Sequence, residues 1–235
     1  MDNREILELS GQLKPVFSIK ELKELTGRSP ATLKKSLIKL KQNHLIWELG
    51  KGQFAFPQDR YTLASNLLFP SYISFTHALY YHHLIEGASS LVYVASSKSK
   101  KDIALEGFTI KFLRQPSHRF FGYRKETFMG KDLFIAEKEK AIADALCFPE
   151  FFPLKETKQA LAKGLDLGRL SAYALRNASS QAIKRLGYLL ETLNLNLPQE
   201  LKEKVTKKYD LLNPAKEKAG EKNKTWKLIL NEQLE

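Results

Sequence analysis

The sequence predicts an α+β protein in which an N-terminal winged helix-turn-helix precedes a mixed domain with a small antiparallel sheet and a mostly helical C-terminal part. Residues 1–60 show the order helix, helix, short turn, helix and hairpin. Residues 65–150 combine alternating and helical apolar spacing, whereas residues 153–235 show mainly helical spacing. We therefore expect a winged-helix domain over 1–60 and a second domain over 61–235.

The composition favours a globular chain with a negatively charged partner. The chain has 235 residues, 43% of them hydrophobic, and its formal net charge is +12. That charge suits nucleic acid or an acidic protein surface. The single cysteine, Cys147, excludes an intramolecular disulfide and fits the cytoplasm. The sequence shows no signal peptide and no run of 18 apolar residues, so we expect a cytoplasmic protein without membrane contact.

The first two predicted helices are short. Residues 3–13 place apolar residues on one side of a helix and charges on the other. In the second helix, Ser18 is a suitable N-cap, and Glu21 stands three residues later, as a capping box requires. Gly27 ends this helix, because glycine readily adopts the left-handed conformation of a C-terminal cap.

The third predicted helix follows after one short turn. Ser29 is its N-cap and Pro30 its first residue, a position where proline loses no helical hydrogen bond. Its apolar face is formed by Leu33, Leu37 and Leu40. The turn of residues 26–29 contains a glycine and has the length that a helix-turn-helix requires. Residues 45–56 then predict two short strands around a Gly-Lys-Gly turn.

This order of elements indicates how the third helix would meet DNA. In a helix-turn-helix the recognition helix lies in the major groove. Lysines on its flanks and at the hairpin tip would contact phosphates, and the small and hydroxyl residues Ala31, Thr32 and Ser36 would lie near base edges. The candidate DNA-binding residues are Arg28, Ser29, Ala31, Thr32, Lys34, Lys35, Ser36, Lys39 and Lys51.

Two alternatives apply to this lysine-rich helix. Many such faces are only solvated surface, and winged helices also serve as protein-docking modules. Between Gly27 and Trp47, however, the chain has five basic residues and no acidic one. A hairpin with a basic tip also follows where a wing is expected, and both features favour DNA binding.

The second domain is predicted to begin with mixed structure. A helix starts near Ser71 or Ser74, residues 89–97 and 108–116 have strand composition, and two further strands flank Gly130. Residues 137–149 return to helical spacing. Further on, helices are expected at 154–165, 166–178 and 180–194, a short one at 199–212, a loop at 213–225 and a final strand or docking segment anchored by Trp226.

Catalytic chemistry is not favoured by the residues present. His77, His82 and His83 lack the spacing of a metal pair, and Cys147 has no neighbour that would activate it. Lys140 and Asp144, four residues apart, are expected to pair on a helix surface. With Glu139 they are also a candidate acid–base set. The sequence has no glycine-rich phosphate loop, so we expect no catalytic residue, no metal and no cofactor.

Residues 74–85 contain the pattern Ser-x-x-x-Ala-Leu-x-x-His, with His82 as the histidine, and residues 135–146 contain Glu-Lys-Ala-x-x-Asp. In their order along the second domain, these segments resemble the AbiEi family of antitoxins from type IV abortive-infection toxin–antitoxin systems. The segment 209–231 is similar to the closing Leu-x-Pro turn and Trp-x-Leu strand. In the family pattern, glycine stands where this chain has His83.

The resemblance implies two activities on one chain. The N-terminal domain would bind inverted repeats of double-stranded DNA in its own promoter and repress the operon. The C-terminal domain would counteract an AbiEii-like nucleotidyltransferase toxin, directly or indirectly, as part of phage defence. The resemblance assigns no role to the motif residues His82, Glu139, Lys140 and Asp144.

A lone winged helix covers few base pairs, so we expect two protomers or two sites to cooperate, for example as a homodimer on DNA. Two other functions stay open. One is a protein-interaction module or a transcriptional regulator without an antitoxin role. The other, ranked third, is an enzyme acting on nucleic acid through Glu139, Lys140 and Asp144.

Overall fold

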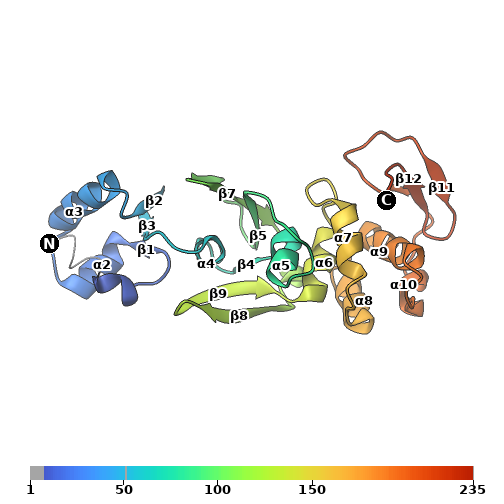
Figure 1. The fold of residues 1–235 in the computed structure, drawn as a ribbon, viewed down its shortest axis with the longest axis horizontal. Coiled ribbons are helices and arrows are strands. Elements are labelled where there is room, and N and C mark those ends of the chain that lie inside the picture. Colours follow the sequence, from blue (N-terminus) through green and yellow to red (C-terminus); the bar gives the residue numbers. More distant parts are fainter. Residues whose placement is uncertain (1–7, 51, 235) are drawn as a thin grey trace. The chain divides into compact units, whose positions relative to one another are not determined.

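The computed structural model of the chain describes residues 8–50 and 52–234. It confirms a mixed α and β architecture with a small antiparallel sheet and a helical C-terminal part (Figure 1). The described residues pack as two units. Unit 1 holds residues 8–72, 90–113 and 125–134, apart from residue 51. Unit 2 holds residues 73–89, 114–124 and 135–234.

Unit 1 begins with short elements whose ends follow local chemistry. They are the 3-10 turn η1 (Leu9–Gly11), β1 (Phe17–Ser18), α2 (Ile19–Thr26), α3 (Pro30–Gln42), β2 (Trp47–Gly50), β3 (Gln53–Ala55) and α4 (Arg60–Asn66). Of the helix predicted over 3–13, the described part contains only η1, and residues 3–7 lie outside the described residues.

The caps of α2 and α3 are those that the sequence predicts. The Ser18 hydroxyl accepts a hydrogen bond from the Glu21 N–H at 3.3 Å, and the Glu21 carboxylate accepts one from the Ser18 N–H at 2.8 Å. Gly27 ends α2 with φ +67°, where a side chain would be strained. Ser29 caps α3, and Pro30 is its first residue. These signals fix the short turn between the two helices.

The hairpin after α3 belongs to a three-stranded antiparallel sheet in the order β1-β3-β2. Strand β2 is irregular between Glu48 and Gly50, where the pairing register shifts. Gly50 and Gly52 both have positive φ, as a tight turn requires. Beyond the hairpin, the Trp47 ring meets Phe108 edge to face, with ring centroids 6.1 Å apart.

The apolar faces of these elements form one hydrophobic core. Leucines of α2 and α3 pack with aromatic and aliphatic residues of the small sheet and its flanks. The buried members are Leu13, Phe17, Leu22, Leu33, Leu37, Leu40, Ile46 and Phe54. Because α3 gives only its leucine stripe to this core, its opposite face is left at the surface.

The largest sheet has six strands in the order β6-β7-β5-β4-β9-β8. The strands are β4 (Ser71–Ile73), β5 (Leu91–Ser96), β6 (Ile103–Leu105), β7 (Phe108–Arg114), β8 (Tyr123–Phe128) and β9 (Lys131–Ala136). The pair β6–β7 is antiparallel, as predicted for this region, whereas β4 and β9 run parallel. More than fifty residues separate β4 from β9, enough for the crossover that a parallel pair needs.

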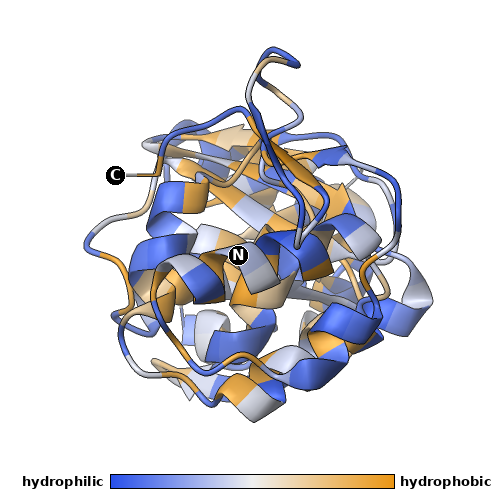
Figure 2. Ribbon diagram, turned by 90° about the vertical axis from the view of Figure 1, so that its right-hand side faces the viewer, coloured by the Kyte–Doolittle hydropathy of each residue, from blue (hydrophilic) through white to orange (hydrophobic). Residues whose placement is uncertain are grey.

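The helices of the protein mix apolar and polar residues along their length, as the colours of Figure 2 show by hydropathy. Within the described residues, unit 2 contains six of these helices. They are α5 (Phe75–Tyr81), α6 (Lys138–Ala145), α7 (Leu154–Leu161), α8 (Leu167–Arg176), α9 (Ser180–Thr192) and α10 (Gln199–Glu203), with a 3-10 turn η2 (Ser117–Arg119). Of the two predicted starts for α5, the structure selects Ser74, because Ser71 lies in β4. Helix α6 packs against α5 and α8.

The C-terminal segment forms a small sheet of β10 (Asp210–Leu211), β12 (Leu228–Leu230) and β11 (Glu221–Asn223). Trp226 is fully buried and donates to the Glu191 carboxylate at 2.8 Å, so it anchors the last strand as predicted. Gly187 on α9 makes room for its ring, because a Cβ there would lie 2.0 Å from ring carbons. The predicted loop 213–225 contains β11, which the sequence pattern did not indicate.

None of the helices in the described residues is both long enough and apolar enough to cross a membrane.

Candidate functional site

The start of α3 is organised by its own cap. The Ser29 hydroxyl accepts a hydrogen bond from the Thr32 N–H at 3.3 Å, and the two hydroxyl oxygens lie 3.0 Å apart. Ala31 stands between them and is exposed. A small, hydroxyl-rich helix start therefore faces solvent, where a ligand can approach the backbone closely.

Helix α3 has two faces with opposite character. Leu33, Leu37 and Leu40 are buried. Opposite them lie residues spaced by four, three and four positions, which places them along one line of the helix. This outward stripe consists of Ala31, Lys35, Ile38 and Gln42, all of them exposed.

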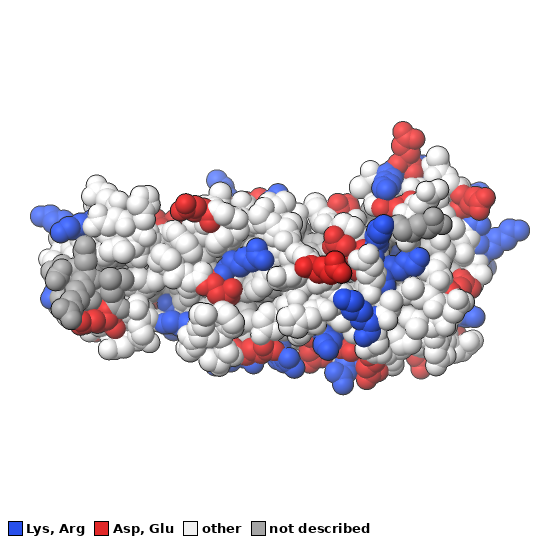
Figure 3. Space-filling view, in the orientation of Figure 1, with Lys and Arg blue, Asp and Glu red and all other residues white. Residues whose placement is uncertain are grey.

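The outward stripe and its flanks carry positive charge that no ion pair neutralises in the described residues. Lys34, Lys35 and Lys39 are exposed, and no ion pair links them to another residue of the described parts of the chain. Lys41 differs, because its ammonium lies 2.5 Å from the Glu48 carboxylate of β2. Figure 3 shows basic and no acidic side chains over the visible part of α3. The face thus presents three lysine charges that no described residue neutralises through an ion pair.

The remaining predicted DNA-binding residues have different surroundings. Arg28 is half-buried in the turn before α3, and its N–H donates to the Thr26 hydroxyl at 3.4 Å. Ser36 is half-buried on the flank of α3, closer to the leucine face than to the outward stripe. Lys51 lies outside the described residues.

Two residues of the outward stripe are absent from the predicted set. They are Ile38, whose exposed fraction is 59%, and Gln42, the last residue of α3. The helical period contains the necessary information, because both positions lie opposite the leucines. Neither residue is basic or small, so a pattern of lysines and small residues does not include them.

The second predicted cluster, in unit 2, is buried rather than exposed. The Lys140 ammonium donates to Asp144 Oδ1 at 2.5 Å and to Asn177 Oδ1 at 2.9 Å. Asn177 Nδ2 donates to Asp144 Oδ1 at 3.1 Å, and the Ser74 hydroxyl donates to Asp144 Oδ2 at 2.8 Å. All four side chains are inaccessible to solvent, and the Lys140 ammonium also lies 4.2 Å from the centre of the Phe121 ring.

The prediction that Lys140 and Asp144 pair on the surface of a helix is therefore wrong about where the pair lies, because both side chains are buried. The i, i+4 contact exists, but α5 and α8 supply Ser74 and Asn177 as further partners and cover it. Glu139 points elsewhere, and its carboxylate accepts a hydrogen bond from the Asp166 N–H at 3.3 Å. Neither Lys140 nor Asp144 can touch a substrate in this structure, so the three residues do not form one open acid–base site.

His82 and His83 end α5 by a recognisable geometry. The His83 N–H donates to the Tyr80 carbonyl and the Leu84 N–H to the Leu79 carbonyl, which is the Schellman pattern. His83 has φ +58°, the left-handed conformation that favours glycine. His82 Nε2 lies 2.8 Å from the Ala136 carbonyl oxygen, so this nitrogen carries the hydrogen.

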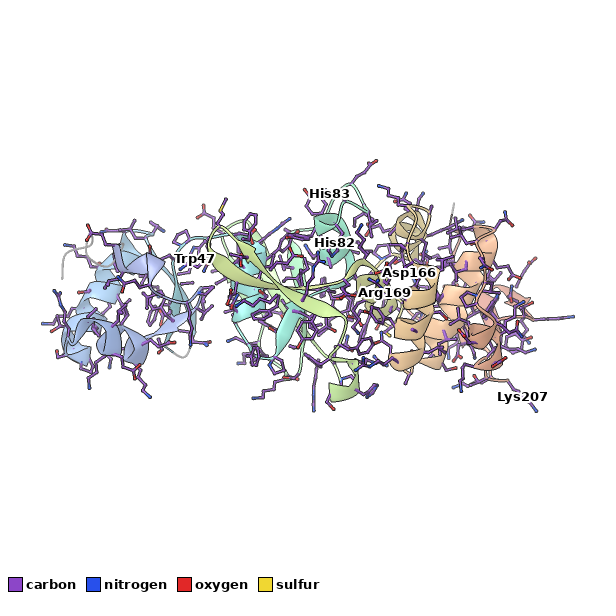
Figure 4. All side chains as sticks on the ribbon, turned by 90° about the horizontal axis from the view of Figure 1, so that it is seen from below. Trp47, His82, His83, Asp166, Arg169 and Lys207 are labelled. Atoms are coloured by element: carbon purple, nitrogen blue, oxygen red, sulfur yellow. The ribbon has the colours of Figure 1, made fainter. Side chains whose placement is uncertain are left out.

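A polar cavity of about 380 Å³ lies beside these residues in unit 2. Its lining carries both signs of charge and consists of His82, Arg124, Glu137, Lys138, Glu139, Asp166 and Arg169. Figure 4 labels His82 after α5 and Asp166 and Arg169 at the start of α8. Asp166 caps that helix by accepting from the Arg169 N–H at 2.9 Å. The acidic side chains are thus occupied within the protein, and the cavity has no excess of either charge.

Two titratable groups near these clusters are held neutral. Burial and a hydrogen bond to Glu137 raise the pKa of Tyr173 to about 12. Burial likewise raises the pKa of the Cys147 thiol, although Arg119 opposes this change. A thiol with a raised pKa is a weaker nucleophile at neutral pH, because less of it is ionised.

In the described residues, no group of three or more His, Cys, Asp or Glu side chains is placed to hold a metal ion. No protein-family model matches the sequence, and no curated protein matches it.

Proposed function

We propose that this chain is a DNA-binding antitoxin of the AbiEi type, working in the cytoplasm. In this proposal residues 1–60 are a winged helix-turn-helix domain that binds inverted repeats of double-stranded DNA in its own promoter and represses the operon. Residues 61–235 counteract a nucleotidyltransferase-like toxin, directly or indirectly. We propose no enzymatic activity, and a homodimer is the expected form on DNA.

The observation that carries the DNA-binding part is the outward face of α3. It presents Lys34, Lys35 and Lys39, which form no ion pair with another described residue, around a helix start of small and hydroxyl residues. The helix follows α2 after a short turn and precedes a hairpin, the order found in winged helices. Such a face matches the width and charge of a DNA major groove.

The lysines and the small residues at the start of α3 would have different roles in DNA binding. Lys34, Lys35 and Lys39 neutralise phosphates and so fix the register of α3 on the duplex. Ala31 and Thr32 allow the start of the helix to come close to base edges. Each neutralised phosphate releases counterions, so affinity falls steeply as salt rises.

Fluorescence anisotropy on DNA from immediately upstream of the gene, compared with a scrambled duplex, tests this part. The wild type should prefer the upstream duplex, and Lys35→Glu/Lys39→Glu should reduce its affinity at least ~100-fold, since two phosphate contacts become repulsions. Lys202→Glu/Lys207→Glu is the matched control, because both residues are exposed in unit 2 and the net charge changes equally. Equal losses in both variants would contradict the assignment to α3.

The antitoxin part is supported by the family resemblance of unit 2 and is tested separately. Co-expression with the product of the neighbouring gene should relieve growth inhibition by that product. The variant Lys35→Glu/Lys39→Glu should still relieve it, because both altered residues lie in the proposed DNA-binding domain, residues 1–60, and outside residues 61–235. No relief by the wild type, together with intact DNA binding, would leave a transcriptional regulator without an antitoxin role.

A further inference from the structure

Ile38 is an exposed apolar residue in the middle of the basic face. Its side chain is 59% exposed, although isoleucine in a helix of this length is usually placed in the core. Residues one helical turn away on either side surround it, namely Lys34, Lys35, Lys41 and Gln42. The residue therefore stands in a polar and largely cationic ring.

The position of Ile38 on α3 is set by the core on the opposite side. Leu33, Leu37 and Leu40 are at most 3% exposed, so the helix cannot rotate to bury Ile38 without exposing them. Ile38 thus points in the direction in which α3 would enter a groove. A single isoleucine at the centre of the contacting stripe needs an apolar partner to gain from burial.

The positive charge around Ile38 indicates that its apolar partner is a group on DNA. The other large exposed apolar residues of unit 1 belong to other elements: Leu25, Phe69, Phe128 and Met129. On α3 only a single large apolar side chain is exposed, and Lys34 and Lys35, which form no ion pair in the described residues, lie one turn before it. This arrangement suits a polyanion that carries isolated apolar groups. In the major groove that apolar group is the C5-methyl of thymine.

We propose that Ile38 is a specificity-determining residue of α3 and that it packs against a thymine methyl group in the DNA site. Gln42 lies one turn further along the same stripe and is exposed. Its amide is suited to a bidentate contact with adenine N6 and N7. Together Ile38 and Gln42 favour A·T base pairs at the positions that the outward stripe contacts in the major groove. The inference rests on the proposed DNA binding of α3.

The test replaces single thymines by deoxyuridine in the upstream duplex, because deoxyuridine lacks the methyl group but keeps the same hydrogen-bonding edge. Anisotropy should show one sensitive thymine per half-site, at which the wild type loses affinity about fourfold, the value expected for one buried methyl group. Ile38→Ala should bind the unmodified duplex about fourfold or more weakly and should show no sensitive position. Alanine is a good helix former, so α3 is retained.

Leu25→Ala is the control, because it also shortens an exposed aliphatic side chain but lies on α2. It should keep the sensitivity of the wild type. If the upstream duplex is bound selectively but the deoxyuridine scan is flat, or if Ile38→Ala keeps the same sensitive thymine, the role of Ile38 is refuted and DNA binding stands. If no duplex is bound in a salt-sensitive way, the proposed function and this inference both fail.

Discussion

Lysine plays opposite parts in the two units of this protein. On α3 of unit 1, Lys34, Lys35 and Lys39 are exposed and their charge is left open to a partner. In unit 2, Lys140 is fully buried, and Asp144 and Asn177 satisfy its ammonium. The difference teaches that a lysine charge is available for binding only where an ion pair within the protein does not already neutralise it.

The comparison also separates residues that hold the fold from residues that act. Removing an exposed lysine costs the fold little, because water solvates the charge and few contacts are lost. Removing one member of a buried pair leaves the other charge without compensation in a medium that solvates it poorly. The following predictions test that separation in order of decreasing effect.

Lys140→Met is expected to give the largest effect. It leaves the Asp144 carboxylate buried without its cation, so the free energy of unfolding should fall by about 3–5 kcal/mol. Lys35→Met, the matched substitution on α3, should change it by less than about 0.5 kcal/mol. Urea unfolding measures both. Equal stabilities of the two variants would remove the distinction between the two lysines.

Asn177→Ala tests whether the network extends beyond one ion pair. The change removes an amide that both accepts from Lys140 and donates to Asp144. The expected loss of unfolding free energy is about 1–3 kcal/mol, the cost of leaving buried polar groups unsatisfied. Gln181→Ala, at an exposed position on α9, serves as the control in the same urea experiment. A wild-type midpoint for Asn177→Ala would mean that the amide is dispensable.

Tyr173→Phe tests the hydrogen bond between Tyr173 and Glu137, two residues that are half-buried. The Tyr173 hydroxyl donates to Glu137 at 2.7 Å, and its loss should cost about 1 kcal/mol at neutral pH. Because folding raises the pKa of Tyr173 from 10.0 to about 12, this contribution is complete below pH 10 and is lost as pH rises toward 12. Unfolding curves at pH 8 and pH 11 should therefore show a smaller difference between variant and wild type at the higher pH. A constant difference would refute the link to tyrosine ionisation.

His83→Gly is expected to give the smallest effect, and a stabilising one. Glycine adopts φ +58° without the strain that a side chain causes, although its freer unfolded chain offsets part of the gain. Thermal unfolding should show a gain of about 0.5 kcal/mol. His82→Gly should instead destabilise, since it removes the ring that bonds to the Ala136 carbonyl. A loss of stability in His83→Gly would show that this side chain makes a contact worth more than the strain.

The elements that were predictable are those with local causes. Ser18, Glu21, Gly27, Ser29 and Pro30 fix α2 and α3 through contacts over a few residues, and the structure places every one of them as the sequence indicated. The strands around Gly130 and the Trp226 anchor follow similarly from short patterns.

The features that the sequence did not predict depend on contacts between residues that are far apart in the chain. Asp144 receives its hydrogen bonds from Ser74, 70 residues away, and from Asn177, 33 residues away, so a pair that looked superficial is buried. The parallel pair β4–β9 likewise joins Ile73 to Ile135. Ile38 is a different case. The leucine face of α3 already places it on the outward side, but a pattern of basic and small residues does not include an isoleucine.

The salt dependence of binding to the upstream duplex tests the central claim most directly. Three phosphate contacts by α3 predict a slope of log K against log salt of about −2.7 for each bound protomer. In Lys35→Gln/Lys39→Gln that slope should shrink by about 1.8, because two contacts are lost. An equal slope for the wild type and the variant would show that Lys35 and Lys39 do not contact DNA phosphates.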